Sequence, residues 1–403
     1  MKYVVIVCDG LSDRAITELN NKTPLSAAKT PVLDKLAGKC ETGIAKTTDT
    51  VNQPDSLKTN MYILGYDPLK FYSGRPALSA ISSGIRFTKE DTVLSCSYVE
   101  LSDEEDFAKK HICSVSAELS EEEKYEISGL LKEKLGNDIF TFASDKNGNP
   151  YIIWKKGEPS PGVFFSPEPI VGEETGTHFP KSDYVIPLSG IMEKSYEILS
   201  QASINKKRRE KGRPEINAVW IEDYGTKPEI ESFSKKYGIT GAVITDDRTI
   251  AGFAKTAGMH SFQIDSSDNF SSVPEFAFKE LKSGTQLVYI HTVKAAKAAL
   301  EGNFREKVKT VEDIDKQIIE PLHQFLKDSG EEFRIMIISS FACSCDIGCP
   351  TAEPVPYMIY DSRDKESASS VFDEIKAFES GKYISYGSDI LQHFIDNENN
   401  LCS

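Results

Sequence analysis

Short apolar segments alternate with segments of helical periodicity along most of the chain. Runs rich in Val and Ile predict strands at Lys2–Cys8, Ala218–Glu222, Gly241–Thr245, Gln286–His291 and Arg334–Ser339. Strands that are apolar throughout are typical of parallel sheets, because helices cover both faces of such sheets. The pattern therefore predicts an α/β fold in which a mostly parallel sheet is flanked by helices.

The segment that follows Thr30 carries the sequence signals of a short helix. Thr30 can cap its start, Pro31 suits its first position, and Gly38 can end it. The apolar residues between them recur at helical spacing. We expect a helix over residues 31–37.

The middle of the chain has a different pattern. Ser120 and three glutamates open an amphipathic helix that reaches Leu135, and strand-like runs follow at 139–143 and 151–154. The Asn-Gly and Asn-Pro steps between these two runs are strong turn signals. This part is predicted to be a small α+β unit. A loop that leads back to the main domain follows, and it carries Pro159, Pro161, Pro167, Pro169 and Pro180.

Composition and charge limit the class of protein. A chain of 403 residues with 39% hydrophobic residues can bury a large core and form two domains. The formal net charge of -15 disfavours nucleic acid and anionic membranes as partners. The early apolar run at 3–7 is too short for a signal peptide or a membrane span, so we expect a cytoplasmic protein. Its eight cysteines are expected to be reduced thiols.

Two residues are candidates for chemistry. Asp9 follows the first predicted strand, and ligands of parallel α/β sheets gather at the carboxyl ends of strands. Its carboxylate could hold a divalent cation, or it could only bond to the turn at Gly10. Ser56 precedes a helix-like run, where the positive helix end would stabilise phosphate or an alkoxide. The alternative is that Ser56 is a simple helix cap.

Several segments together resemble a known family. The segments 1–10, 22–31 and 54–68, with Asn205–Arg209 and Glu353–Pro356, are similar to archaeal-type cofactor-independent phosphoglycerate mutases of the alkaline phosphatase superfamily. The resemblance covers nearly the whole chain. It implies an alkaline-phosphatase-like domain at 1–105 and 185–403 and an inserted α+β lid domain at 106–184. It also implies that Ser56 stands at the phosphorylated nucleophile and that Asp9 and Ser56 are retained metal positions.

The resemblance fails where the family has its other metal ligands. In the family, an Asp and a His follow a strand that ends in a histidine, and these two positions are Ala296 and Leu300 in this chain. The family also has an Asp-His step after another strand, and this step corresponds to Ser340 and Phe341. A further histidine of the family falls on or beside Pro350. Apart from the Ser340 hydroxyl, these side chains have no lone pair for a cation, whereas a pair of metals needs a mixed carboxylate and imidazole shell. The residue after the nucleophile, usually acidic in the family, is also replaced, by Leu57.

The substrate contacts that the family implies are also reduced. Two of its phosphate-binding arginines fall on Ser95 and Ile152, whereas Arg75 and Lys58 remain as candidate substrate contacts. The basic run Lys206–Arg209 could bind phosphate, but such runs are more often solvated helix faces.

A cysteine-rich loop lies where the relatives carry metal ligands. Cys343, Cys345, Asp346 and Cys349 could together form a rebuilt zinc site. The spacing is not a standard zinc pattern, and the alternative is that these are ordinary buried or partly buried thiols.

Two hypotheses follow. The first is a degenerate mutase-like protein that keeps the fold, lacks mutase activity, and binds a small phosphorylated or other anionic ligand or a protein partner that the sequence does not identify. The alternative is an active phosphotransferase or mutase, with a phosphoserine at Ser56 and a rebuilt metal site. No cofactor is expected under the first hypothesis, and manganese or zinc under the second. Without a counter-cation, Asp9 should gain little from ionisation, so Asp9→Asn should leave stability unchanged or slightly raised.

Overall fold

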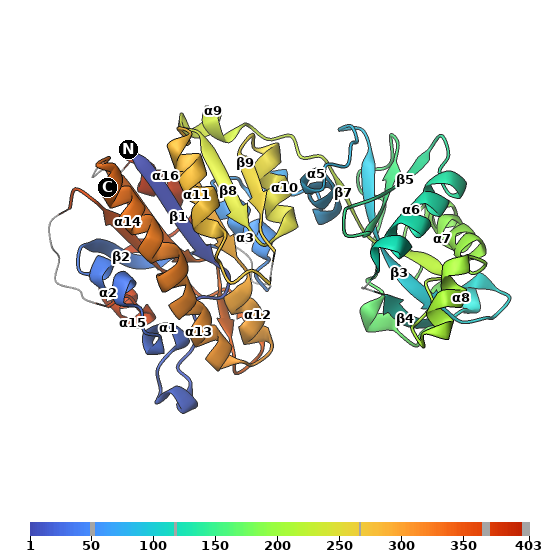
Figure 1. Cartoon of the computed structure of the whole chain (residues 1–403), viewed down its shortest axis with the longest axis horizontal. Coiled ribbons are helices and arrows are strands. Elements are labelled where there is room, and N and C mark those ends of the chain that lie inside the picture. Colours follow the sequence, from blue (N-terminus) through green and yellow to red (C-terminus); the bar gives the residue numbers. More distant parts are fainter. Residues whose placement is uncertain (49–52, 117–118, 266, 365–370, 397–403) are drawn as a thin grey trace. The chain divides into compact units, whose positions relative to one another are not determined.

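The computed structural model describes residues 1–48, 53–116, 119–265, 267–364 and 371–396. The chain forms two compact units, which are seen in Figure 1: unit 1 comprises Met1–Tyr72 and Ile230–Ser403, and unit 2 comprises Ser73–Glu229. Unit 2 is wider than the insertion predicted at 106–184. The reason is that β3 (Thr92–Leu101) pairs with strands inside that range, β4 (Ile112–Ser116) and β6 (Pro150–Trp154). It also pairs with β7 (Ala218–Thr226), which lies beyond the range.

Unit 1 is built on a mixed, mostly parallel sheet. Its strand order is β15-β2-β14-β11-β1-β10-β8-β9. The central strand β1 pairs in parallel with β10 and β11, whereas β14 is antiparallel to both of its neighbours. The strands are β1 Lys2–Cys8, β2 Cys40–Ala45, β8 Gly241–Thr245, β9 His260–Gln263, β10 Leu287–Thr292, β11 Phe333–Ser339, β14 Val355–Asp361 and β15 Tyr383–Ile384.

Four of the five predicted strands lie in this sheet, at or within a few residues of their predicted bounds. The fifth prediction, Ala218–Glu222, is a strand, but it was wrongly assigned to the parallel sheet: it belongs to β7 in the antiparallel sheet of unit 2. The strands β2, β9, β14 and β15 were not predicted.

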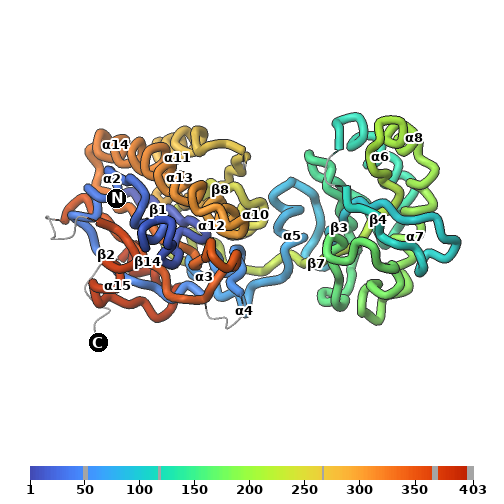
Figure 2. The backbone as a smooth tube through the Cα atoms, turned by 90° about the horizontal axis from the view of Figure 1, so that it is seen from below, coloured from blue at the N-terminus to red at the C-terminus, as the bar shows by residue number. Residues whose placement is uncertain are grey.

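The two faces of β1 pack against different helices. Val4, Ile6 and Cys8 join the main core, to which α2 (Pro31–Ala37), α11 (Val273–Lys282), α13 (Phe304–Ile314) and α14 (Glu320–Ser329) contribute. Tyr3 points to the other face, where its ring lies edge-on to Phe394 of α16 (Ile390–Asp396) at 5.7 Å. Figure 2 shows α11, α13 and α14 on one side of β1, with α3 (Ser56–Ile63) and α15 (Glu374–Glu379) on the other.

The predicted helix at 31–37 is confirmed, but its start is capped differently. The Thr30 side chain makes no capping hydrogen bond, and Gly38 is right-handed at φ -68°. Asp315 accepts hydrogen bonds from the backbone N–H groups of Val32 (3.2 Å) and Leu33 (2.7 Å) instead. A carboxylate distant in sequence therefore satisfies the N–H groups that the local signal had assigned to Thr30.

Unit 2 contains the helix and the two strands that were predicted for the middle of the chain. Its antiparallel sheet has the order β4-β3-β6-β5, with β7 also paired to β3. Its remaining strands are β4 Ile112–Ser116, β5 Phe140–Ser144 and β6 Pro150–Trp154, and its main helices are α6 Glu121–Lys134, α7 Val185–Leu199 and α8 Ser203–Glu210. A capping box of Ser120 and Glu123 starts α6 as expected. No helix in the described ranges is both long and apolar enough to cross a membrane.

The basic run 206–209 lies on α8 and links it to neighbouring acidic residues. Arg208 is 3% exposed and donates to Glu123 of α6 at 2.9 Å. The exposed Lys207 pairs with Glu122 in the same way, at 2.8 Å. These pairs support a structural role for the run within unit 2.

A buried ion pair joins β11, β14 and the C-terminal helix. Arg334 donates from Nε to Asp361 at 2.6 Å and from Nη1 to the carbonyl of Phe394 at 2.9 Å. Burial raises the pKa of Asp361, but hydrogen bonds from Arg363 and Arg334 outweigh burial and lower this pKa below its ordinary value. A lowered pKa stabilises the folded state above the unfolded pKa of about 3.9, and this stabilisation is lost as the pH falls through the folded value.

We therefore expect Asp361→Asn to weaken the protein at neutral pH and to flatten its stability profile in acid. Denaturant unfolding at a series of pH values below neutrality measures this effect. The control is Asp328→Asn on the exposed end of α14, which should follow the wild-type profile. Equal acid sensitivity of the wild type and Asp361→Asn would contradict the expectation.

Candidate functional site

The carboxyl ends of neighbouring strands bring a polar cluster together in unit 1. Asp9 follows β1, His291 lies near the end of β10, Asp246 follows β8, and Ser340 follows β11. The first turns of α3 add Ser56 and Asn60 to the cluster. The structure thus unites the two predicted residues, Asp9 and Ser56, and surrounds them with groups that were not predicted.

Protein groups occupy both oxygens of the Asp9 carboxylate. Ser56 Oγ donates to Oδ2, and Ser340 Oγ donates to Oδ1. Asn60 Nδ2 donates to Oδ1 at 3.3 Å, and His291 Nε2 lies 3.1 Å from the same oxygen. The His291 contact is a close ion pair rather than a well-directed hydrogen bond.

Asp9 and His291 form a buried carboxylate–imidazolium pair. Burial raises the pKa of Asp9, but the charge of His291 and the hydrogen bonds from Ser340 and Ser56 outweigh it, so the pKa is lowered. Burial lowers the pKa of His291, but the charge of Asp9 outweighs burial and raises it. The expectation that Asp9 lacks a counter-cation was therefore wrong, because His291 supplies the positive charge.

A second carboxylate lies on the far side of the His291 ring. His291 Nδ1 is 2.8 Å from Thr245 Oγ1 and 4.0 Å from Asp246 Oδ1. Asp246 accepts from Thr292 Oγ1 at 2.8 Å and from the Val293 N–H at 3.1 Å. Burial raises the pKa of Asp246. The hydrogen bond with Thr245 orients the imidazole toward Asp9, and Asp246 adds a nearby negative charge.

Ser56 is the first residue of α3 and not its cap. The cap is Asp55, whose side chain accepts from the Lys58 N–H at 2.9 Å. The interpretation of Ser56 as a simple capping serine is therefore wrong. Asn60 lies one turn later, bonded to the Ser56 carbonyl at 2.9 Å and to Tyr289 Oη at 2.6 Å.

An apolar cluster contains two of the residues at positions where the family resemblance implies metal ligands, Ala296 and Phe341. We use the name apolar cluster for the packed side chains of Ile16, Ala296, Ala299, Phe341, Cys343 and Cys345. Ala296 and Phe341 are 6% and 4% exposed. Gly10 packs against this cluster at φ +69°, and a Cβ there would lie 2.8 Å from both Ala296 Cα and Cys343 Cβ. Leu300, at another ligand position, is 52% exposed.

The donor set around Asp9 does not fit a pair of metal ions. Within the described residues, no three or more His, Cys, Asp or Glu side chains are grouped so as to hold a metal. The groups nearest to Asp9 are two hydroxyls, one amide and one imidazole. Two adjacent divalent cations need several carboxylates and imidazoles, so the residues present are too few and of the wrong kind.

The cysteine loop does not assemble the zinc set considered from sequence. Cys343 and Cys345 are buried, Asp346 is exposed, and Cys349 is partly buried on β13 (Cys349–Thr351). Burial raises the pKa of Cys343 to about 11 and, with a hydrogen bond to Asp13, that of Cys345 to about 12. Among the residues that the structure describes, these side chains are not grouped with the three or more His, Cys, Asp or Glu donors that a zinc site needs.

A buried lysine lies beneath the apolar cluster. Lys307 Nζ, from α13, donates to Asp13 Oδ2 at 2.7 Å and to the carbonyls of Cys343 at 2.6 Å and Ser12 at 3.2 Å. The side chains of Lys307 and Asp13 are 0% exposed. Asp13 also accepts from the Cys345 N–H at 3.2 Å. This ion pair fixes the loop after Asp9 to the loop that carries the cysteines.

The two predicted substrate contacts lie in different units, Lys58 in unit 1 and Arg75 in unit 2. Lys58 Nζ lies 4.5 Å from the centre of the Tyr72 ring and lines a separate cavity of about 340 Å³ with Thr47 and Tyr62. Arg75 begins α5 (Arg75–Ser82) of unit 2 and lowers the pKa of Asp223, which burial raises overall.

The two positions where the family resemblance implies phosphate-binding arginines, Ser95 and Ile152, lie in unit 2. They fall on paired strands, where Ser95 is opposite Tyr151 and Ile152 is opposite Leu94.

The sequence contained a signal for some of the residues that were missed. Asp246 and His291 lie at or just after the carboxyl ends of two correctly predicted strands. The rule that was applied to Asp9 would have selected both residues. Lys307 and Asn60 gave no such signal, because each lies on a helix whose inward face depends on tertiary packing.

Comparisons with known proteins give matches over nearly the whole chain. The family model described as the metalloenzyme superfamily matches residues 1–395. The 2,3-bisphosphoglycerate-independent phosphoglycerate mutase of Methanosarcina barkeri is 30% identical over 400 residues, which cover 97% of this chain and 98% of that protein. The protein of the same name from Methanosarcina mazei is 29% identical over 386 residues, with 94% of each chain covered.

Two solved structures have the same fold. A protein from Pyrococcus horikoshii matches with a TM-score of 0.79 at 23% identity, covering 98% of this chain and 96% of that one. A cofactor-independent phosphoglycerate mutase from Thermoplasma acidophilum matches with a TM-score of 0.66 at 23% identity, covering 98% and 99%. These matches confirm the predicted α/β fold, a central sheet flanked by helices.

Proposed function

Because the chain belongs to the metalloenzyme superfamily and, within it, to the archaeal-type cofactor-independent phosphoglycerate mutases, we propose that it is a degenerate member that keeps the fold and lacks mutase activity. The observation that carries this proposal is the apolar cluster. It places Ala296 and Phe341, at two family ligand positions, in a packed hydrophobic environment. Function resides in the site and not in the fold, so the fold persists when the site is replaced.

The chemistry of Ser56 supports the same proposal. A serine hydroxyl is a weak nucleophile unless a base or a metal activates it. Asp9 accepts the Ser56 proton in a hydrogen bond, but its lowered pKa makes it a poor general base at neutral pH. Within the described part of unit 1, the protein cation nearest to Asp9 is His291, which is already paired with this carboxylate.

The proposed remaining role is to bind a small anion or a protein partner in the cytoplasm. The cysteines of the described residues are free thiols, which fits a reducing compartment.

A second candidate is a residual phosphotransferase with Ser56 as nucleophile. The observation that favours it is the retained hydrogen bond between Ser56 and Asp9. It would require a cation ligated by Asp9 and by groups other than the cysteine loop.

The test is conversion of 3-phosphoglycerate in a coupled assay with manganese, cobalt or zinc supplied. We expect the wild type to match its own Ser56→Ala variant, because the ligand shell for an activating metal is incomplete. The Methanosarcina barkeri protein serves as the positive control. Turnover in the usual range of about 1–1000 per second that disappears in Ser56→Ala would overturn the proposal. Hydrolysis of p-nitrophenyl phosphate that depends on Ser56 and on added metal would favour the second candidate.

A further inference from the structure

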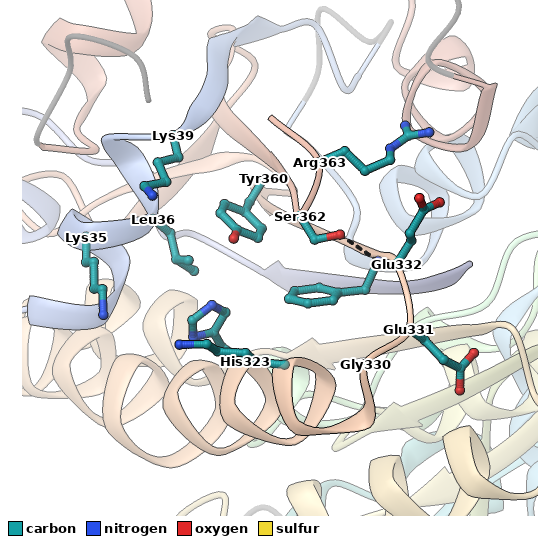
Figure 3. Close-up of a pocket in the computed structure, with 12 residues that line it drawn as sticks. Lys35, Leu36, Lys39, His323, Gly330, Glu331, Glu332, Tyr360, Ser362 and Arg363 are labelled. Carbon is teal, nitrogen blue, oxygen red and sulfur yellow. Dashed lines mark hydrogen bonds between the residues drawn. The ribbon is translucent and has the colours of Figure 1, made fainter. Parts of the chain in front are cut away.

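A second cavity of about 530 Å³ lies at the other end of the sheet in unit 1. Figure 3 shows it between α2, α14, the start of β11 and the end of β14. Phe333 is the first residue of β11, whereas the cluster around Asp9 lies beyond the last residue of this strand. The cavity is therefore separated from that cluster by the length of a strand.

Three lysines line this cavity. Lys35 and Lys39 come from α2 and the turn after it, and Lys327 comes from α14. In the described part of the chain, the ammonium groups of Lys35 and Lys327 form no hydrogen bond or ion pair. The formal net charge of the chain is -15, so three lysines at one cavity have the opposite sign to the chain as a whole.

The other charged groups of the lining are arranged differently. Arg363 is bound to Asp361, with contacts of 2.9 Å from Nε and 2.7 Å from Nη2. In Figure 3, Glu331, Glu332 and Arg363 lie at the far end of the view and extend outward, whereas Lys35 and Lys39 lie near His323 and Tyr360. The part of the cavity between the lysines is therefore positively charged.

Aromatic rings form one wall of the cavity. The His323 ring lies edge-on to Phe333 at 6.0 Å and to Tyr360 at 5.8 Å, and Phe333 lies 5.8 Å from Tyr360. Burial, together with the charges of Lys35 and Lys327, lowers the pKa of His323. The imidazole is therefore neutral at physiological pH and can both donate and accept a hydrogen bond.

We propose that this cavity binds a small phosphate monoester that carries a flat ring, of the nucleoside monophosphate class. Lys35, Lys39 and Lys327 hold the phosphate as point charges, and the rings of His323 and Tyr360, which Phe333 supports from the core, pack against the ligand ring. The volume lies within the range of about 300–1000 Å³ that is usual for small-molecule sites. The inference does not depend on the proposed function, because no residue around Asp9 takes part in it.

Isothermal titration with adenosine 5′-monophosphate tests the proposal, with adenosine and inorganic phosphate as separate ligands. We expect the monophosphate to bind more tightly than either part alone and to bind more weakly as potassium chloride is added. The double variant Lys35→Gln, Lys327→Gln should weaken binding about tenfold or more, because two of the three charge-assisted contacts to the phosphate are lost. Both lysines are exposed, so folding should be unaffected.

The matched control is Lys279→Gln, Lys316→Gln, which removes the same charge from exposed positions outside the cavity. It should leave the dissociation constant within about twofold, because only screened long-range attraction is lost. Equal weakening by both double variants, or no binding to the wild type at millimolar concentration, would overturn the proposal. Inorganic phosphate that binds as tightly as the nucleotide would overturn the role given to the aromatic wall.

A second measurement uses His323 as a local reporter. Bound phosphate should raise the pKa of this imidazole in histidine NMR spectra, because the anion offsets the charges of Lys35 and Lys327. The other neighbours of the ring, Phe333 and Tyr360, carry no charge near neutral pH. An unchanged His323 titration in a nucleotide-bound sample would place the ligand elsewhere and overturn the assignment.

Discussion

Replacing Lys307 with alanine is expected to destabilise unit 1 by about 3–5 kcal/mol, the usual cost of removing one partner from a buried ion pair. The variant leaves the Asp13 carboxylate and the carbonyls of Ser12 and Cys343 without the ammonium group that they share. Water cannot replace it readily, because both charged side chains are 0% exposed.

Lys309→Ala on the same helix is the matched control. Lys309 pairs with Asp313 one turn later, and its side chain is 54% exposed. Exposed pairs of this kind contribute about 0.3–0.5 kcal/mol, so the control should be nearly neutral. Lys307→Met should lose almost as much as Lys307→Ala, since it keeps the aliphatic stem and removes only the charge. Adding Asp13→Asn to Lys307→Met should recover part of the loss, because the buried charge is then gone.

The measurement must report unit 1 specifically, because a chain of two compact units need not unfold in one step. Both tryptophans, Trp154 and Trp220, lie in unit 2, so tryptophan fluorescence follows the wrong unit. Hydrogen exchange of the β1 amides, with far-ultraviolet circular dichroism for the whole chain, gives the required signal. Equal effects of Lys307→Ala and Lys309→Ala on β1 exchange would show that the buried pair contributes no more to stability than the exposed pair does.

Strands could be predicted from the sequence where their apolar runs are continuous. They could not be predicted where a residue within the strand, such as a proline, argues against a strand. β1 and β8 have no polar residue to interrupt their core-facing positions, and their bounds were predicted as observed. β14 carries Pro356, which argues against a strand, yet this residue pairs with Ile44 of β2 near the edge of the sheet. Such a placement depends on the neighbouring strand and not on the segment itself.

The domain boundary depends on pairing between distant segments. β3 and β7 are more than one hundred residues apart, and their antiparallel register brings Tyr98 opposite Val219. The predicted boundary at residue 106 came from the family resemblance, but the sheet of unit 2 begins before it, at β3. No local pattern records that pairing.

Only part of the site could be predicted, because its other residues are brought together by the pairing of strands that are distant in sequence. Asp9 and Ser56 carry motif information, whereas the partners of Asp9 follow from sheet register. Val7 is opposite His291 and His291 is opposite Thr245, so adjacent parallel strands deliver their polar ends to one place. The side chains that stand at the ligand positions implied by the family resemblance could be read directly from the sequence. The positive charge of His291, which compensates the Asp9 carboxylate, was not predicted. This charge reverses the expectation that Asp9→Asn would leave stability unchanged or slightly raised.

Asp9→Asn is expected to lower the free energy of unfolding by about 1.5–3 kcal/mol, the usual worth of hydrogen bonds to a charged group. The lowered pKa of Asp9 stabilises the folded state above its unfolded pKa of about 3.9. The raised pKa of His291 stabilises it fully below the unfolded value of about 6.5, and this contribution is lost as the pH rises through the folded value. The difference between wild type and variant should therefore be largest between these two values and should shrink at alkaline pH.

Asp246→Asn provides the matched comparison, because its carboxylate flanks the other nitrogen of the same imidazole at 4.0 Å. Burial raises the pKa of Asp246, so ionisation there opposes folding at neutral pH, and a neutral amide should leave stability unchanged or slightly raised. Denaturant unfolding near pH 6, with the His291 titration followed by NMR, measures both variants. We expect the His291 pKa to fall much more in Asp9→Asn than in Asp246→Asn. If Asp9→Asn left both stability and the His291 pKa unchanged, Asp9 would not be paired with His291, and the site would instead be open to an external cation.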